Sequence, residues 1–180
     1  MQDLWRMSAT ELASLIKSKE VSAKESAEAA LTRLYSVNPM INAVVDYRPD
    51  DVMMQAKAID AAIARGEELG PLAGVPVTTK IGADQEGFAT SDGMKLQRDN
   101  IASTDNPAIA NLRKSGAILL GRTNSSAASY RWFSTNLLHG NTKNPRDPNI
   151  TPGGSSGGAG AAVAACAQVW GGFRISIRLP

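Results

Sequence analysis

The first 66 residues repeat apolar positions with the period of amphipathic helices. Ser8 stands three residues before Glu11, and Ser22 stands three residues before Glu25. Each pair fits a capping box, in which the hydroxyl and the carboxylate bind free backbone N–H groups at a helix start. The apolar residues that follow the two pairs at helical spacing are Leu12, Leu15, Ile16, Ala27, Ala30, Leu31 and Leu34. The pattern therefore predicts two helices, each with one buried face.

A proline and a β-prone stretch follow the second helix. The Asn38-Pro39 pair predicts the end of that helix, because the residue before a proline disfavours helical backbone angles. Residues 42–47 read Asn-Ala-Val-Val-Asp-Tyr and include several types that favour strands. We therefore expect one short strand after the helix.

A third helix is expected to complete this region. Either Asp50 or Asp51 can cap its start, its pattern runs through Ile63, and Gly66 is a typical stop. Residues 1–66 carry no group of side chains with recognisable chemistry. We interpret them as a packed helical layer.

The next segment predicts a strand, a loop, a helix and a second strand. Residues 74–80 form an apolar stretch that ends in Lys80, and residues 82–106 are rich in glycine, aspartate and threonine, as loops are. Residues 107–116 begin with proline and end with glycine, which is typical of a helix. Residues 117–121 then read as a buried strand. This order indicates a crossover unit, and hence a parallel strand pair in an α/β sheet.

The composition of the chain excludes several classes of function and of binding site. The 180 residues suit one domain or part of a larger one. Nineteen basic and seventeen acidic residues give a net charge of +2, too balanced for a nucleic-acid or membrane-surface binder. One cysteine, Cys166, and one histidine, His139, exclude a disulfide framework, a cysteine-based zinc site and a multi-histidine metal site. No apolar run reaches the roughly 20 residues that span a bilayer, and the first residues do not resemble a secretory signal, so a cytoplasmic location is expected.

A glycine-rich loop with two serines carries the clearest chemical signal. Residues 140–160 contain Ser155 and Ser156 among glycines, and the small apolar residues 161–165 follow as a tightly packed helix. Three interpretations compete. A flexible linker does not fit a loop that leads directly into a core-type helix. A phosphate cradle lacks the lysine of a P-loop, and Val163 stands where a dinucleotide fingerprint needs glycine or alanine. The third is a nucleophile loop, in which glycines let the backbone approach a substrate and serines supply hydroxyls.

A serine nucleophile needs a base to remove its proton. Histidine is the usual base, but we interpret His139 as a loop or packing histidine. Lys80 can serve instead if burial lowers its pKa until the amine is neutral near pH 7. The alternative is a strand-end lysine that extends its amine to water, and position alone favours this alternative. By contrast, four lysines lie in helical segments among polar neighbours, which predicts solvated faces: Lys17, Lys19, Lys24 and Lys57.

Four ordered stretches resemble landmarks of the amidase signature family. They are residues 71–80, 121–124, 144–148 and 151–165, the last reading Thr-Pro-Gly-Gly-Ser-Ser-Gly-Gly-Ala-Gly-Ala-Ala-Val-Ala-Ala. The resemblance implies an α/β fold, with N-terminal helices followed by part of a mixed, α/β/α-layered sheet. Residues 1–180 would form one partial domain, with a helical layer over 1–66 and a truncated catalytic core over 71–180.

The resemblance also implies a Ser–Ser–Lys triad. Lys80 would be the general base, and Ser155 would be the bridging serine, following a cis peptide bond. Ser176, within a Ser-Ile-Arg-Leu-Pro stretch, would be the nucleophile. Ser156 would support the loop. The triad needs neither a metal nor an organic cofactor.

The residues before the nucleophile depart from the family pattern. Backbone N–H groups from Phe173 to Ser176 would stabilise the oxyanion, but Arg174 and Ile175 stand where the family has glycines. The chain also stops four residues after Ser176, at less than half the family's length. We therefore expect an N-terminal fragment with little or no activity of its own.

The implied reaction is hydrolysis of a carboxamide to a carboxylic acid and ammonia or an amine. The implied partner is a small amide, whose identity cannot be read from the sequence, and homo-oligomerisation is left open. One alternative is a relative of the glutamyl-tRNA amidotransferase A-type subunit, which releases ammonia from glutamine and needs a partner protein. A second alternative is a catalytically inactive amidase-like fragment.

Overall fold

The fold is a small sheet with helices on both faces. A computed structural model describes residues 3–165 and 170–171. Its α-helices are α1 (Ala9–Lys17), α2 (Ala23–Ile41), α3 (Pro49–Ala64), α4 (Pro107–Lys114) and α5 (Gly157–Ala164). Its strands are β1 (Val44–Asp46), β2 (Pro76–Lys80), β3 (Ile118–Thr123), β4 (Thr135–Asn136), β5 (Gly140–Asn141) and β6 (Trp170–Gly171). Its 3-10 helices are η1 (Leu4–Arg6), η2 (Lys95–Gln97) and η3 (Ala127–Ser129). Within these described ranges, no helix combines the length and the apolar character needed to cross a membrane.

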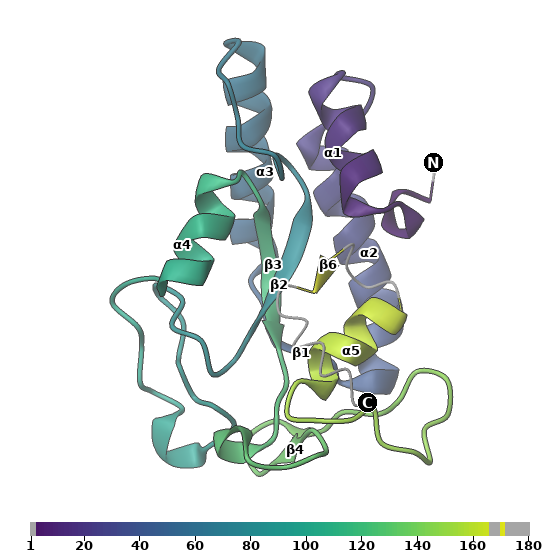
Figure 1. The fold of residues 1–180 in the computed structure, drawn as a ribbon, viewed down its shortest axis with the longest axis vertical. Coiled ribbons are helices and arrows are strands. Elements are labelled where there is room, and N and C mark those ends of the chain that lie inside the picture. Colours follow the sequence, from purple (N-terminus) through teal and green to yellow (C-terminus); the bar gives the residue numbers. More distant parts are fainter. Residues whose placement is uncertain (1–2, 166–169, 172–180) are drawn as a thin grey trace, which may run out of the picture.

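The main sheet has the strand order β1-β3-β2-β6 (Figure 1). β2 and β3 run parallel, with Val77 opposite Leu119 and Lys80 opposite Thr123. Because α4 lies between them in the chain, the predicted crossover and parallel pair are confirmed. β1 lies antiparallel to β3, and β6 lies parallel to β2.

Both predicted capping boxes are present at the starts of α1 and α2. The Ser8 hydroxyl accepts a hydrogen bond from the backbone N–H of Glu11, whose carboxylate accepts from the N–H of Ser8 at 2.8 Å. Ser22 and Glu25 repeat the arrangement, also at 2.8 Å. These signals act within one helical turn, so sequence alone locates them well.

The predicted end of α2 at Asn38-Pro39 is wrong, because the helix continues through Pro39 to Ile41. A proline removes one backbone donor, but here little more than half a turn of helix follows it. Asn42 then takes a left-handed conformation, with φ of 49°, and its N–H donates to the carbonyl of Asn38. The side chain of Asn38 accepts from the N–H groups of Ala43 and Val44, both at 2.9 Å. Asn38 thus joins the helix to β1.

The start of α3 also differs from the prediction. The N-cap residue is Arg48, whose side chain makes no capping hydrogen bond, and Pro49 occupies the first turn. Asp50 and Asp51 therefore lie inside the first turn, where a carboxylate interacts favourably with the positive end of the helix dipole. The predicted stop is confirmed, since Gly66 has φ of +77° just after the helix.

Two apolar layers cover the sheet. Ile118 and Leu120 point to a core formed with α2, α3 and α5. Leu119, between them in β3, points to the opposite face with Val77 of β2 and Ile109 of α4. Figure 1 shows α4 on one side of the sheet and α2 and α5 on the other. The predicted layering of helix, sheet and helix is therefore confirmed.

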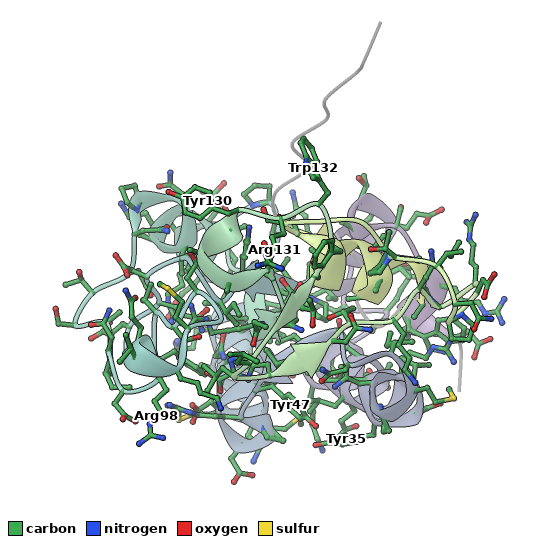
Figure 2. The ribbon with its side chains drawn as sticks, turned by 90° about the horizontal axis from the view of Figure 1, so that it is seen from below. Tyr35, Tyr47, Arg98, Tyr130, Arg131 and Trp132 are labelled. Atoms are coloured by element: carbon green, nitrogen blue, oxygen red, sulfur yellow. The ribbon has the colours of Figure 1, made fainter. Side chains whose placement is uncertain are left out.

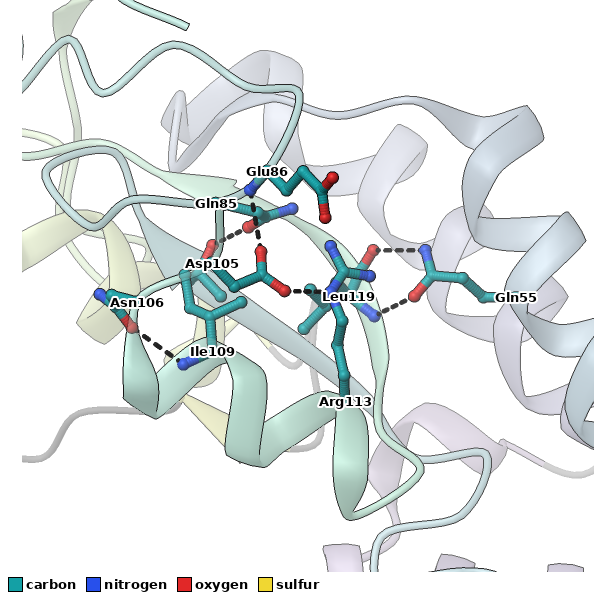
Figure 3. A network of polar contacts seen from close by, with 9 residues as sticks. Gln55, Gln85, Glu86, Asp105, Asn106, Ile109, Arg113 and Leu119 are labelled. Atoms are coloured by element: carbon teal, nitrogen blue, oxygen red, sulfur yellow. Dashed lines mark hydrogen bonds and ion pairs between the residues drawn. The ribbon is translucent and has the colours of Figure 1, made fainter. Parts of the chain in front are cut away.

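Polar side chains attach the surrounding elements to β3 and α4 (Figure 3). Gln55 of α3 accepts from the N–H of Leu119 at 2.9 Å and donates to its carbonyl at 3.4 Å. Asp105 accepts from the N–H of Glu86 at 2.8 Å and from Arg113 at 2.6 Å. Gln55 thus joins α3 to β3, and Asp105 holds the long loop between β2 and α4 against α4.

Candidate active site

Lys80 and Ser155 meet although they are far apart in sequence. Lys80 is the last residue of β2, and its Nζ donates to the Oγ of Ser155 at 2.9 Å. Ser155 lies just before α5, which packs over β1, β2 and β3. The strand end and the glycine-serine loop therefore converge on one point, and the catalytic roles of the two residues stay predictions.

The surroundings of Lys80 change its acid–base chemistry. The four residues before it in β2 are buried, and Lys80 itself is half-buried. Burial lowers the pKa of the Lys80 amine, while the negative charge of Asp92 acts in the opposite direction. The amine engages the Ser155 hydroxyl, which disfavours the alternative of a lysine that only reaches for water. By contrast, the lysines assigned to solvated helix faces are exposed: Lys17, Lys19, Lys24 and Lys57.

The backbone at Ser155 is closely confined. The Gly154–Ser155 peptide bond is cis, as predicted, and Gly153 has φ of +88°. A Cβ atom at Gly154 would overlap the backbone N of Phe133 and lie 2.7 Å from the carbonyl oxygen of Arg131. Glycine is therefore required at position 154, because the neighbouring backbone leaves no room for a side chain.

Two serines that the sequence analysis missed hold the Ser155 loop. The N–H of Ser126 donates to the carbonyl of Ser155 at 3.3 Å. The Oγ of Ser134 accepts from the N–H of Gly157 at 2.7 Å and lies 3.2 Å from the carbonyl oxygen of Ser155, to which it can donate. Both serines are fully buried. For Ser126, the available signal was the pair of serines that closely follows the buried strand β3; Ser134 had no such signal.

Helix α5 begins at Gly157, four residues earlier than the predicted start at residue 161. The glycines lie inside the helix because of a close contact. A Cβ atom at Gly158 would overlap the carbonyl oxygen of Asn124 and lie 2.6 Å from its nitrogen. Ser156 occupies the N-cap position, and its side chain makes no capping hydrogen bond. Its supporting role stays a prediction.

The remaining predicted site residues, Phe173, Arg174, Ile175 and Ser176, lie outside the described residues. β6 is the last described element before them in the chain. It pairs in parallel with β2 opposite Val77 and Thr78.

Arg122 anchors the loop that follows Lys80. Its side chain is fully buried, one residue before the end of β3. The guanidinium donates to the carbonyls of Lys80 at 3.2 Å and Ala83 at 2.6 Å, and also to that of Ala89. Burial lowers the pKa of Arg122, and the carboxylates of Asp46 and Asp84 oppose this effect. The sequence showed Arg122 only as part of a landmark, without this function.

His139 lies in the turn between β4 and β5. Its backbone N–H donates to the side chain of Asn136 at 2.7 Å, and Asn42 donates to its carbonyl at 2.7 Å. Burial lowers the pKa of its imidazole, Asp46 raises it, and Arg122 lowers it further. The interpretation as a loop histidine is confirmed. Over residues 3–165 and 170–171, no group of three or more metal-ligating side chains comes together.

Comparison with known proteins identifies relatives over most of the chain. The profile of the Amidase family matches residues 25–171. An indoleacetamide hydrolase from Bradyrhizobium diazoefficiens is 48% identical over 162 residues, covering 90% of this chain and 31% of that protein. The A-type subunit of a glutamyl-tRNA(Gln) amidotransferase from Acidothermus cellulolyticus is 41% identical over 165 residues, covering 92% of this chain and 33% of that protein.

Solved structures give the same result for the fold. A fatty acid amide hydrolase superposes with a TM-score of 0.90 at 30% identity, covering 93% of this chain and 30% of that chain. A bacterial aryl acylamidase of the amidase signature family superposes with a TM-score of 0.86 at 32% identity, covering 90% of this chain and 34% of that chain. The chain spans about a third of the length of the curated relatives it matches. By sequence and by fold, the chain belongs to the amidase family.

Proposed function

We propose that this chain carries the proton-transfer part of a serine amidase, which hydrolyses a carboxamide to a carboxylic acid and ammonia or an amine. The observation that carries the proposal is the 2.9 Å contact between Lys80 Nζ and Ser155 Oγ. Burial lowers the pKa of this lysine, which favours the neutral amine that a general base requires.

The proposed reaction begins with two proton transfers in series. Neutral Lys80 accepts the hydroxyl proton of Ser155, and Ser155 accepts the proton of Ser176. The Ser176 oxygen attacks the amide carbon, and the carbonyl oxygen becomes an oxyanion. Backbone N–H groups between Phe173 and Ser176 donate hydrogen bonds to that oxyanion. No metal or organic cofactor takes part.

Collapse of the tetrahedral intermediate completes acyl transfer. The carbon–nitrogen bond breaks, and the leaving nitrogen takes the proton that returns through Ser155 from Lys80. The acyl group stays on Ser176 as an ester. A water molecule gives a proton to Lys80 through Ser155 and attacks the ester carbon. The ester carbon–oxygen bond then breaks, the acid leaves, and the Ser176 oxygen takes the proton back along the same path.

We infer that residues 1–66 and 71–180 belong to one partial amidase domain. The support is a shared core, in which side chains of α2 and α3 pack with those of β3 and α5. The helical layer thus helps to place α5, and with it the loop that holds Ser155.

A chimera tests the proposed function. Residues 1–165 of this chain are joined to the remaining part of the Bradyrhizobium indoleacetamide hydrolase, the relative that is 48% identical. We expect the chimera to release ammonia from indole-3-acetamide, and Ser155→Ala to reduce its turnover by about 10²-fold or more. A folded chimera without turnover, assayed beside the active intact relative, would contradict the proposal and favour a catalytically inactive fragment.

A second candidate is the ammonia-releasing role of an amidotransferase. It is supported by the 41% identity to the Acidothermus amidotransferase over 165 residues. The same chimera design, built on the Acidothermus protein with its partner proteins present, should then hydrolyse glutamine. Turnover of simple amides without glutamine hydrolysis would decide against this second candidate.

A further inference from the structure

A carboxylate that the proposed reaction does not use lies beside Lys80. The N–H of Asp92 donates to the carbonyl of Ile81, the next residue after Lys80, at 3.3 Å. A Cβ atom at Gly82 would lie 2.6 Å from the Oδ1 of Asp92. The Asp92 side chain is therefore folded over the backbone that immediately follows the lysine.

Hydroxyl groups hold this carboxylate in place. Ser129 Oγ donates to Asp92 Oδ1 at 2.9 Å, and Ser125 Oγ lies 3.4 Å from the same oxygen. The N–H of Ala128 donates to the Asp92 carbonyl at 2.9 Å. The Asp92 side chain is thus fixed by the segment that follows β3.

The backbone around Asp92 adopts unusual conformations. Asp92, Ala128 and Ser129 have φ values of 42°, 51° and 59°, in the left-handed region that residues other than glycine seldom occupy. Such conformations persist where the surrounding structure holds them, and they cluster at functional sites. Three of them meet here, next to Lys80.

The same segment also contacts the bridging serine. Ser126 stands in the chain between Ser125 and Ser129, whose hydroxyls approach Asp92. Its N–H donates to the carbonyl of Ser155. The segment 125–129 therefore contacts both Asp92 and Ser155. This geometry fixes both groups that bear on the amine.

The other charged groups in the neighbourhood face Arg122. The guanidinium of Arg122 donates to the backbone carbonyl of Lys80, and its charge interacts with Asp46 and Asp84. Asp84 also accepts from the hydroxyl of Thr90 at 2.7 Å. In the described part of the chain, Asp92 is the charged side chain that acts on the pKa of the Lys80 amine.

We infer that Asp92 is a positioning residue for the proposed amidase reaction: its tethered carboxylate balances the charge of the Lys80 amine and directs it toward Ser155. The inference rests on the proposed function. Burial favours a neutral amine and the nearby negative charge favours a protonated one. Asp92 thereby limits the burial effect, so that Lys80 can both accept a proton and return it.

The test measures the titration of Lys80 in the full 180-residue chain. Trace labelling with isotopic acetic anhydride across a pH series, read by peptide mass spectrometry, gives the midpoint of Lys80 labelling. Lys17 and Lys57, which are exposed, serve as internal references. The test variant is Asp92→Asn, because asparagine has a similar shape and tolerates left-handed backbone. The matched control is Asp84→Asn.

Asp92→Asn is expected to move the Lys80 midpoint to lower pH. Just below the wild-type midpoint, Lys80 labelling should rise roughly threefold over the internal references. Asp84→Asn should leave the midpoint in place. Ser129→Ala, which keeps the charge but removes the short tether, should shift it in the same direction by less. Thermal melts confirm which variants are folded.

An unchanged Lys80 midpoint in folded Asp92→Asn would overturn the inference, as would an equal shift in Asp84→Asn. If Asp92→Asn does not fold, an unchanged midpoint in Ser129→Ala overturns it instead. The readout needs no turnover, so its failure is distinct from failure of the proposed function. A shifted midpoint together with an inactive chimera would leave the charge coupling standing while refuting the amidase reaction.

Discussion

Lys80 takes its chemistry from the place where β2 ends. A lysine on an exposed helix face keeps its amine in water, as Lys57 of α3 does. At the end of a buried strand, the same side chain loses part of its hydration and meets Ser155. At the scale of single residues, position in the fold therefore separates the proposed base from an ordinary surface lysine.

The lowered pKa of Lys80 predicts a pH-dependent stability difference. Between the folded-state pKa and the ordinary lysine value of about 10.4, the unfolded chain binds more protons than the folded one. The wild type should therefore gain stability relative to Lys80→Met as pH rises through that range. Urea denaturation at several pH values measures the difference, with Lys57→Met as the control for loss of a lysine. A wild type that loses stability relative to Lys80→Met would contradict the account.

Arg122 is expected to contribute strongly to stability. Replacement by Met removes the donor for three backbone carbonyls in the loop after Lys80. We expect Arg122→Met to lower the free energy of unfolding by about 3 kcal/mol. The control Arg98→Met, at an exposed position labelled in Figure 2, should change it by less than about 0.5 kcal/mol. Similar urea midpoints for the two variants would show that Arg122 does not hold the loop.

At the scale of elements, local signals were predicted well and through-space contacts were not. The capping boxes at Ser8 and Ser22 depend on residues within one turn, and both are present. The start of α5 depends instead on how closely Gly158 approaches the backbone of Asn124, just after β3, which no local pattern reveals. The resemblance identified Lys80 and Ser155 through motifs.

The contacts around those two residues had no comparable signal. Ser134 and Asp92 act through hydrogen bonds to distant parts of the chain, so their sequence neighbourhood did not indicate them. Ser126 had only the weak signal of the hydroxyl residues that follow β3. Sequence motifs thus reveal the chemical groups of such a site more readily than the groups that position them.

Two glycines in α5 provide a matched test of its packing. Gly158→Ala would force a Cβ atom into the backbone of Asn124, so we expect a loss of about 2 kcal/mol or more in the free energy of unfolding. Gly160 is exposed, and a Cβ atom there would lie 3.8 Å from its nearest neighbour. Gly160→Ala should therefore stabilise the protein by about 0.5–1 kcal/mol. Equal effects of the two substitutions on chemical denaturation would contradict the close contact between Gly158 of α5 and Asn124.

At the scale of the whole molecule, the candidate site lies where ligands usually bind in α/β sheets. Lys80 is the last residue of β2, and Thr123 is the last residue of β3. Lys80 and the segment that follows Thr123 therefore both lie at the carboxyl ends of parallel strands. Figure 2 views the molecule from the lower end of Figure 1 and shows Tyr130 and Trp132 along one edge. Their side chains are 89% and 82% exposed. They belong to the same segment that confines Gly154, so aromatic surface lies beside the Ser155 loop.

The most direct test of the central claim is the turnover of the chimera when Lys80 is replaced. If Lys80 accepts the proton of Ser155, Lys80→Met should lower kcat by about 10²- to 10⁴-fold. Lys57→Met, on the exposed face of α3, should leave kcat unchanged. The measurement is ammonia release from indole-3-acetamide by both folded variants. A Lys80→Met chimera that keeps its kcat would contradict a reaction in which this lysine is the base.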